Sequence, residues 1–151
     1  LINWLTQGAR PTTVTAVTQT IKPNKYPKVD DEATIILSYP EMQGIIQASW
    51  NWPISRKDME VYGRTGQVIA KNRHDLEVRQ GDQHPVEKFK LEELEDPRDD
   101  PFAYFAAVIN GEIKLGPHDL SAPENNLLVN EILEAAIRSA KTGMTVPFDP
   151  R

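Results

Sequence analysis

The chain contains no cysteine among its 151 residues. It therefore has no disulfide, thiol nucleophile or cysteine-ligated zinc, although this fits either redox compartment. No apolar run approaches the roughly 20 residues of a membrane-spanning helix, and no leader of the signal-peptide type stands at Leu1. We expect no membrane partner. Because Leu1 is not an initiator methionine, we expect the native N-terminus to be missing; the compartment stays unknown, with the cytoplasm favoured and export possible.

The sequence also lacks a basic surplus and the common fingerprints of catalysis. Its net charge is −5 and its pI is near 5.2, which disfavours a nucleic-acid partner. Neither Gly-x-Gly-x-x-Gly nor Gly-x4-Gly-Lys-Ser/Thr occurs, and no serine lies in a Gly-x-Ser-x-Gly elbow. The three histidines, His74, His84 and His118, are isolated, whereas zinc needs three or four convergent ligands. We therefore expect no catalytic residue, no metal and no cofactor bound by this chain alone.

Short segments with strand character fill the first two thirds of the chain. Residues 12–21 are rich in Thr and Val, which favour strands. Period-2 alternation on either side of a short turn at residues 40–44 predicts a hairpin. Further runs at 57–62, 67–71, 75–80 and 85–90 are joined by short turns, which favour antiparallel neighbours. The predicted hairpin faces are Ala33, Ile35, Leu37 and Tyr39 on one strand and Ile46, Ala48, Trp50 and Trp52 on the next.

Helical patterns stand at both ends of the chain. Residues 1–5 look like the end of a helix that Gly8 caps. Asp100 and Pro101 predict the start of a second helix, and Ser121 with Glu124 forms a capping-box pattern for a third, which Gly143 ends. The apolar faces are Phe102, Phe105, Ala106 and Ile109 on the second helix, and Leu128, Ile132, Ala135 and Ser139, widened by Val129, Leu133 and Ala136, on the third.

Strands first and helices later is the layout of an α+β domain. We therefore predict a single α+β domain over residues 1–151, with an open, mostly antiparallel β-sheet and helices packed on one face. The Gly63-x-x-Gly66 pair could be a phosphate-clamping loop of the KH type. Strand-like residues flank it on both sides, however, which favours a four-residue hairpin turn.

Two tryptophans allow two interpretations. Trp50 and Trp52 point to the same face of the predicted strand, where large aromatic side chains commonly pack into a core under helices. Alternatively they form an aromatic wall for a sugar or polyol, with Asn51, Ser55 or Arg56 as hydrogen-bonding partners at the turn that Pro53 fixes.

Three segments carry a resemblance to a known family. They are ASWNWPISRKDMEVYG (48–63) followed by Arg64-Thr65-Gly66, VDDEATIIL (29–37) and NEILEAAIRSAKTG (130–143). Together they resemble the C-terminal domain of the glucose-fructose oxidoreductase/inositol dehydrogenase/rhizopine-catabolism (Gfo/Idh/MocA) family of NAD(P)-dependent oxidoreductases. The family's nucleotide fingerprint, its Glu-Lys-Pro motif and its Asp-x3-His/Tyr motif match no position here and would lie upstream of Leu1. The resemblance thus implies a two-domain parent whose N-terminal Rossmann domain is missing from this chain.

The resemblance also implies a role. This chain would be the substrate-side and oligomerisation domain of an NAD- or NADP-dependent sugar or polyol oxidoreductase, inactive alone. Its partners would be its own Rossmann domain and further copies, bound through the open sheet face. Trp52, Ser55 and Arg56 are the predicted substrate contacts, and Trp50 belongs to the core or to the oligomer face. The alternative is a non-catalytic module that binds carbohydrate or protein through its aromatic sheet face.

Overall fold

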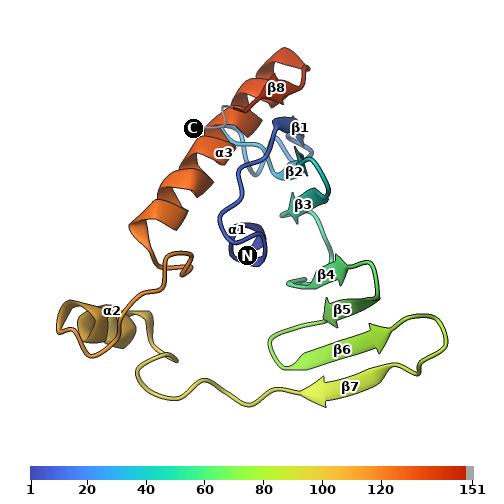
Figure 1. Ribbon diagram of the computed structural model, residues 1–151. Helices are drawn as coiled ribbons and strands as arrows, with labels where there is room; N and C mark the ends of the chain where they lie inside the picture. Colours follow the sequence, from blue (N-terminus) through green and yellow to red (C-terminus); the bar gives the residue numbers. More distant parts are fainter. Residues whose placement is uncertain (149–151) are drawn as a thin grey trace. The chain divides into compact units, whose positions relative to one another are not determined.

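The computed structural model describes residues 1–148, which divide into two compact units (Figure 1). The first unit comprises residues 1–51 and 114–148, and the second comprises residues 52–113. In chain order the elements are α1 (Ile2–Leu5), β1 (Thr13–Gln19), β2 (Glu32–Ser38), β3 (Gln43–Ser49), β4 (Met59–Tyr62), β5 (Gly66–Ala70), β6 (Asp75–Gln80), β7 (Glu87–Lys90), α2 (Pro101–Ile109), α3 (Pro123–Thr142) and β8 (Val146–Pro147). In the described part of the chain, none of the helices combines the length and apolar character that crossing a membrane requires.

The first unit is built on a four-stranded antiparallel sheet in the order β3-β2-β1-β8. Ile35 lies opposite Ala16 on β1 and Ile46 on β3, and Leu37 lies opposite Val14. Since side chains alternate along a strand, this register gathers these apolar residues on one face. The predicted face of β2 is confirmed: Ile35, Leu37 and the following Tyr39 are all buried.

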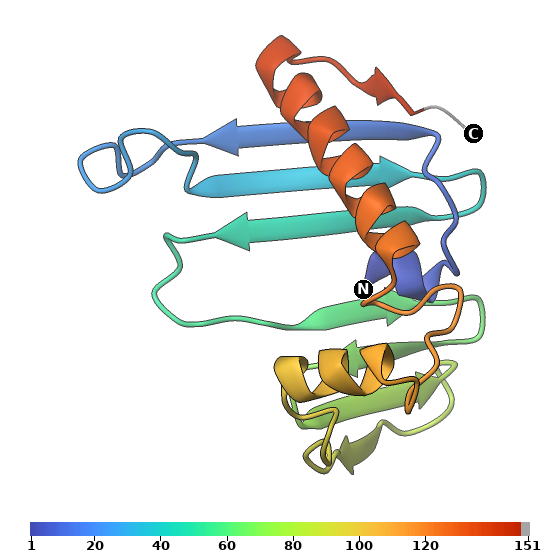
Figure 2. The same cartoon turned by 90° about the vertical axis from the view of Figure 1, so that its left-hand side faces the viewer.

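Helix α3 lies across this face of the sheet (Figure 2). Its buried residues recur at helical spacing, as the sequence predicts, and contact the apolar residues of β1 and β2. Phe148 joins the same cluster. The buried residues of the helix are Leu128, Ile132, Ala135, Ala136 and Ser139.

Ser139 is the polar member of this core. Its hydroxyl accepts a hydrogen bond from the backbone N–H of Ala16 at 2.9 Å and donates one to the backbone oxygen of Met144 at 2.7 Å. The side chain is fully buried, and backbone groups satisfy its hydroxyl both as donor and as acceptor. Ser139 therefore ties the helix to β1 and to the turn after the helix. Gly143 ends α3 in the left-handed conformation, with φ of 66°, as predicted.

The start of α3 differs from the capping-box prediction. Its N-cap is Ala122, not Ser121, and no side chain caps it. The reason is Pro123, which occupies the first helical position and holds the preceding residue in an extended conformation. Ser121 instead donates its backbone N–H to the Asp119 carboxylate at 2.8 Å.

The second unit has its own four-stranded antiparallel sheet, in the order β4-β5-β6-β7. The open antiparallel sheets and the helices confirm the predicted α+β class, although the strands form two sheets where the sequence predicts one. The pairing of the predicted runs is correct, and all described pairs are antiparallel. Gly63 donates its N–H to the Gly66 oxygen at 2.8 Å, which makes the Gly63–Gly66 segment a hairpin turn and not a phosphate clamp.

Helix α2 begins as predicted but does not bury the predicted face. Asp100 caps it by accepting the N–H groups of Phe102 and Ala103 at 2.7 and 2.8 Å. However, Phe102, Phe105 and Ile109 are 64–82% exposed. The buried residue of this helix is Ala107. A helical period identifies an apolar face, but it does not say what covers that face.

Candidate functional site

The predicted substrate contacts lie in the second unit, and two of the three come together. The Arg56 guanidinium stands over the Trp52 ring, 5.3 Å from its centroid. Its Nε and Nη2 donate to the two carboxylate oxygens of Asp58 at 2.6 and 2.7 Å. Ser55, the third predicted contact, directly precedes Arg56 and is exposed. Asp58 was not among the predicted residues, and its place two residues after Arg56 is no specific signal for this pair.

The Arg56–Asp58 pair is electrostatically matched. The hydrogen bond to Asp58 raises the pKa of Arg56 above its ordinary value. The same hydrogen bond from Arg56 lowers the pKa of Asp58, and desolvation opposes it only in part. Both of these guanidinium donors face Asp58, so the carboxylate balances the charge of Arg56. The Arg56 side chain that stacks on Trp52 is therefore already paired with an acid. A substrate hydroxyl would share Arg56 with this carboxylate.

Trp50 lies outside the strand that was predicted to carry it. β3 ends at Ser49, although the Trp50 N–H still donates to the backbone oxygen of Asp31 at 2.9 Å, one step beyond the last pair, Glu32–Ser49. The side chain is 61% exposed and packs against Tyr26, with ring centroids 4.9 Å apart. Within this chain Trp50 is thus not a core residue, and its place at an oligomer face stays a prediction.

Asp31 anchors the loop beside Trp50. Its carboxylate accepts the backbone N–H groups of Ile21 and Lys22 at 2.7 and 2.8 Å, while its backbone oxygen also accepts from the Asn51 side chain. Desolvation by burial pushes the pKa of Asp31 upward, but the hydrogen bonds from Ile21, Asn51 and Lys22 outweigh it and hold the pKa below its ordinary value. The carboxylate form therefore stabilises the loop.

This shift predicts acid sensitivity of the first unit. The folded protein holds the pKa of Asp31 below its ordinary value of 3.8. The stabilisation from the carboxylate is therefore fully present at a pH above 3.8, and it is lost as the pH falls through the lower pKa of the folded protein. We expect Asp31→Asn to flatten the dependence of the melting temperature on pH between about pH 5 and about pH 3. The exposed neighbour Asp30 supplies the control substitution, Asp30→Asn. Identical pH profiles for the two variants would contradict this role of Asp31.

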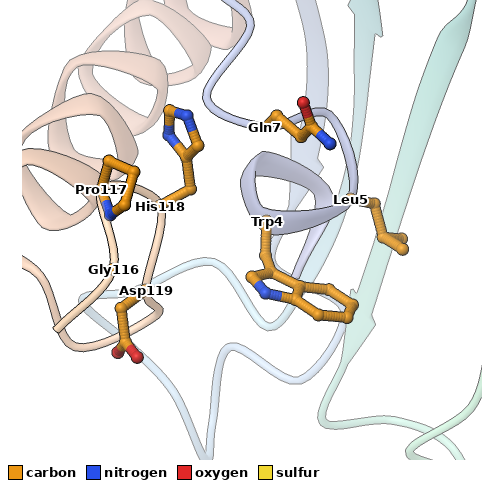
Figure 3. A pocket seen from close by; sticks show the side chains of 7 residues that line it. All are labelled: Trp4, Leu5, Gln7, Gly116, Pro117, His118 and Asp119. Atoms are coloured by element: carbon orange, nitrogen blue, oxygen red, sulfur yellow. The ribbon is translucent and has the colours of Figure 1, made fainter. Parts of the chain in front are cut away.

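The first unit also holds an open pocket of about 590 Å³. One wall comes from α1 and the turn after it, and the other from the loop that precedes α3, as Figure 3 shows. The indole of Trp4 is 53% exposed. We call these seven residues the Trp4–His118 pocket: Trp4, Leu5, Gln7, Gly116, Pro117, His118 and Asp119.

Two turns shape the Trp4–His118 pocket. Gln7 and Gly8 both have positive φ, 53° and 76°, and the Gly8 N–H donates to the Asn3 oxygen at 2.7 Å. A Cβ on Gly8 would lie 2.7 Å from Nδ1 of His118, so the imidazole stands close to a backbone in the left-handed region, which favours glycine. On the opposite wall, Asp119 accepts the N–H groups of Ser121 and Ala122, which holds the loop in place.

Sequence reasoning dismissed His118 as isolated and gave Trp4 no role. The two residues are 114 positions apart (118 − 4), so no spacing rule connects them. The only local signal is a glycine and a proline directly before His118, which predict a turn. Among residues 1–148, no three His, Asp or Glu side chains lie close enough together to hold a metal ion.

Comparison with known proteins shows what this chain is similar to. Residues 1–69 match the model of the GFO/IDH/MocA C-terminal domain. A comparison with curated proteins found no match. The model match agrees with the resemblance over residues 1–69, which are fewer than half of the chain.

Three solved structures share the fold. An aldose-aldose oxidoreductase from Caulobacter crescentus, complexed with glycerol, is 18% identical with a TM-score of 0.73, over 97% of this chain and 44% of that one. An Agrobacterium radiobacter oxidoreductase in complex with NAD+, L-tartaric acid and magnesium is 20% identical with a TM-score of 0.66, over 97% and 45%. An inositol dehydrogenase homolog from Azotobacter vinelandii, with NADH and myo-inositol, is 15% identical with a TM-score of 0.66, over 92% and 44%. The chain thus spans less than half the length of each.

Proposed function

We propose that this chain is the substrate-side and oligomerisation domain of an NAD- or NADP-dependent oxidoreductase that acts on a sugar or polyol. The observation that carries the proposal is the family match over residues 1–69. In this proposal a Rossmann domain elsewhere in the longer protein binds the cofactor, and this chain alone transfers no hydride. The chain contributes one wall of the substrate cleft, and the cofactor supplies the hydride chemistry.

The oligomerisation role is supported by the uncovered face of the first sheet. Helix α3 covers only one face, and Val17 and Ile45 on the opposite face are exposed. An apolar sheet face of this kind is buried against another layer in stable proteins. In this proposal a second copy supplies that layer. Light scattering on the longer protein measures its mass, and a monomer at working concentration would remove this half of the proposal.

The test of the function is turnover by the longer protein. We expect it to reduce NAD or NADP in the presence of at least one sugar or polyol from a panel of aldoses, inositols and linear polyols. The 151-residue chain at the same concentration is the control and is expected to give no turnover. A longer protein that binds neither cofactor and oxidises none of the panel would contradict the proposal.

Arg56 tests the predicted substrate contacts. In the longer protein, we expect Arg56→Ala to raise the substrate KM by about three- to tenfold, because it removes one charged hydrogen-bond donor from the cleft. Lys57→Ala next to it is the matched control and should leave KM unchanged. Unchanged kinetics for Arg56→Ala would remove Arg56 from the substrate site.

A second candidate function has one observation in its favour. The exposed Trp50 ring beside Tyr26 is an aromatic surface of the kind that binding modules use. A non-catalytic carbohydrate- or protein-binding module would use this surface without a cofactor. Loss of ligand binding in Trp50→Ala, in a longer protein that binds no nicotinamide cofactor, would favour this alternative.

A further inference from the structure

We propose that Asn110 is a site of spontaneous covalent modification, at which the chain releases ammonia and the asparagine becomes aspartate or isoaspartate. Asn110 is the C-cap residue of α2, in the second unit, and Gly111 follows it directly. The reaction consumes water and uses no bound ligand. It goes beyond the oxidoreductase function proposed above and does not depend on it.

The reaction begins at the backbone nitrogen of Gly111. When this nitrogen loses its proton to hydroxide, it attacks Cγ of Asn110 and closes a succinimide ring. The bond between Cγ and Nδ2 breaks, and Nδ2 leaves as ammonia. Water then opens the ring: addition at Cγ gives aspartate, and addition at the backbone carbonyl carbon gives isoaspartate. The net change adds water and releases ammonia, with no oxidation or reduction.

The glycine sets Asn110 apart from the other asparagines. Glycine has no Cβ, so no side chain shields the attacking nitrogen. The other asparagines of the chain precede Trp, Lys, Arg, Asn, Leu or Glu. Gly111 has a positive φ of 78°, the left-handed conformation in which glycine follows the end of a helix. The end of α2 therefore favours the residue that makes Asn110 reactive.

Solvent reaches both partners of the reaction. Asn110 and Gly111 are exposed. In the described chain, apart from the neighbours in sequence, no heavy atom would lie within 4 Å of a Cβ on Gly111. Hydroxide can thus approach the Gly111 nitrogen, and water can approach the ring that forms there.

The side chain of Asn110 is also weakly held. Among residues 1–148 it makes a single hydrogen bond, from Nδ2 to Oε1 of Glu112 at 3.3 Å. Asn72, in a turn of the same unit, is held by three. Its Oδ1 accepts the N–H groups of His74 and Asp75 at 2.8 and 2.9 Å, and its Nδ2 donates to the Asp75 carboxylate at 2.7 Å. Asn110 therefore reaches the reactive geometry more easily than Asn72.

The end of α2 acts as a brake on the reaction. The Gly111 N–H donates to the backbone oxygen of Val108 at 3.1 Å, and Asn110 has a helical ψ of −7°. This hydrogen bond must break and ψ must rotate before the nitrogen can attack Cγ. Helix ends open more readily than helix interiors. The rate in the folded chain is thus the rate of a free peptide multiplied by the fraction of time that the end of α2 is open.

The product opens the same helix end further. Aspartate places a negative charge at the C-terminal end of α2, where the helix dipole disfavours it. It also replaces the hydrogen bond to Glu112 by two neighbouring carboxylates. Isoaspartate lengthens the backbone within a turn that the N–H groups of Glu112 and Ile113 close on the Ala107 oxygen, at 2.9 and 3.2 Å. Both products therefore loosen the end of α2.

The test follows the folded 151-residue chain by peptide mass spectrometry during incubation at neutral and at mildly alkaline pH. A glutamate-specific protease releases residues 96–112 and 61–77, each with a single asparagine, Asn110 and Asn72. We expect Asn110 to convert about tenfold or more faster than Asn72, because Asn72 must break more hydrogen bonds. We also expect the rate to rise with pH, since the attacking nitrogen must lose a proton.

Two variants separate the chemistry from its effect on the helix. Asn110→Gln keeps a side-chain amide but requires a larger ring, and we expect residues 96–112 of this variant to stay unmodified. Asn110→Asp reproduces the charge of the product, and we expect the backbone amides of residues 110–113 to exchange about two- to fivefold faster. Asn24→Asp is the matched control, because it adds the same charge at an exposed position of the first unit. It should leave these amides unchanged.

A synthetic peptide of residues 96–112 shows when the conditions suffice for reaction. An unmodified Asn110 in the folded chain after this peptide has converted would overturn the proposal. Equal conversion at Asn110 and Asn72, or a rate that does not change with pH, would overturn it as well. Equal amide exchange in Asn110→Asp and Asn24→Asp would remove the effect on α2.

Discussion

Replacing Leu37 by alanine is expected to lower the free energy of unfolding of the first unit by about 2–5 kcal/mol. Leu37 is 1% exposed and lies opposite Val14 in the sheet, in the cluster covered by α3. Truncation leaves a cavity that α3 and the sheet cannot fill without shifting. Since a domain of this size is stable by about 5–15 kcal/mol, the loss is a large share of the total.

Ile45→Ala is the matched control for Leu37→Ala. Ile45 lies on the neighbouring strand but on the opposite face of the same sheet, where it is 58% exposed. We expect its replacement to change stability by roughly 0.5 kcal/mol or less. Urea unfolding at low protein concentration measures both variants. Equal losses would contradict the assignment of the covered face.

Replacing Gly66 by alanine is expected to destabilise the sheet of the second unit by about 1–3 kcal/mol. Gly66 pairs with Gln80 across β5 and β6, and a Cβ on Gly66 would overlap the backbone oxygen of Arg79. A backbone carbonyl in a strand cannot move aside as a flexible side chain can, so the ladder must open. Amide hydrogen exchange of β5 and β6 measures the effect.

Gly63→Ala provides the control in the same turn. A Cβ on Gly63 would have its nearest contact at 3.5 Å from the Gly66 oxygen, an ordinary van der Waals distance. We expect unchanged exchange protection in β5 and β6 for this variant. Equal loss of protection in both variants would show that the turn, and not the close approach of Gly66 to Arg79, limits stability.

The sequence predicts best those elements whose apolar pattern matches the face that the structure buries. The alternation around Ile35 and Leu37 predicts the β2–β3 hairpin, and the 3.6-residue period around Ile132 predicts α3 with its buried face. Gly143 correctly predicts the end of α3, because the residue that ends this helix has the left-handed conformation, which favours glycine.

Predictions fail where the outcome depends on what packs against an element. The period of Phe102, Phe105 and Ile109 is helical, yet this face is exposed in the described chain. The alternation continues past Ser49 in the sequence, but β3 ends there, and the exposed Trp50 ring packs against Tyr26 rather than into the core. Hydrophobic periodicity shows which residues share a face, but it does not show which other part of the chain packs against that face.

The candidate site shows the same limit. Arg56 and Trp52 are close in sequence, so their association was predictable, whereas the Asp58 partner follows from geometry that the sequence pattern does not specify. The Trp4–His118 pocket joins two segments that are far apart in the sequence, 4–7 and 116–119, because α1 lies beside the loop before α3. The sequence alone could not predict this contact, because it depends on how the first sheet and α3 bring those segments together.

The central claim is that this chain is the substrate-side part of a nicotinamide-dependent oxidoreductase. The most direct test is a fluorescence titration of NADH and NADPH against the 151-residue chain and against the longer protein that contains it. We expect saturable binding of at least one cofactor by the longer protein and none by this chain. Binding by neither would contradict the claim, and binding by this chain alone would contradict the assignment of the cofactor to a separate Rossmann domain.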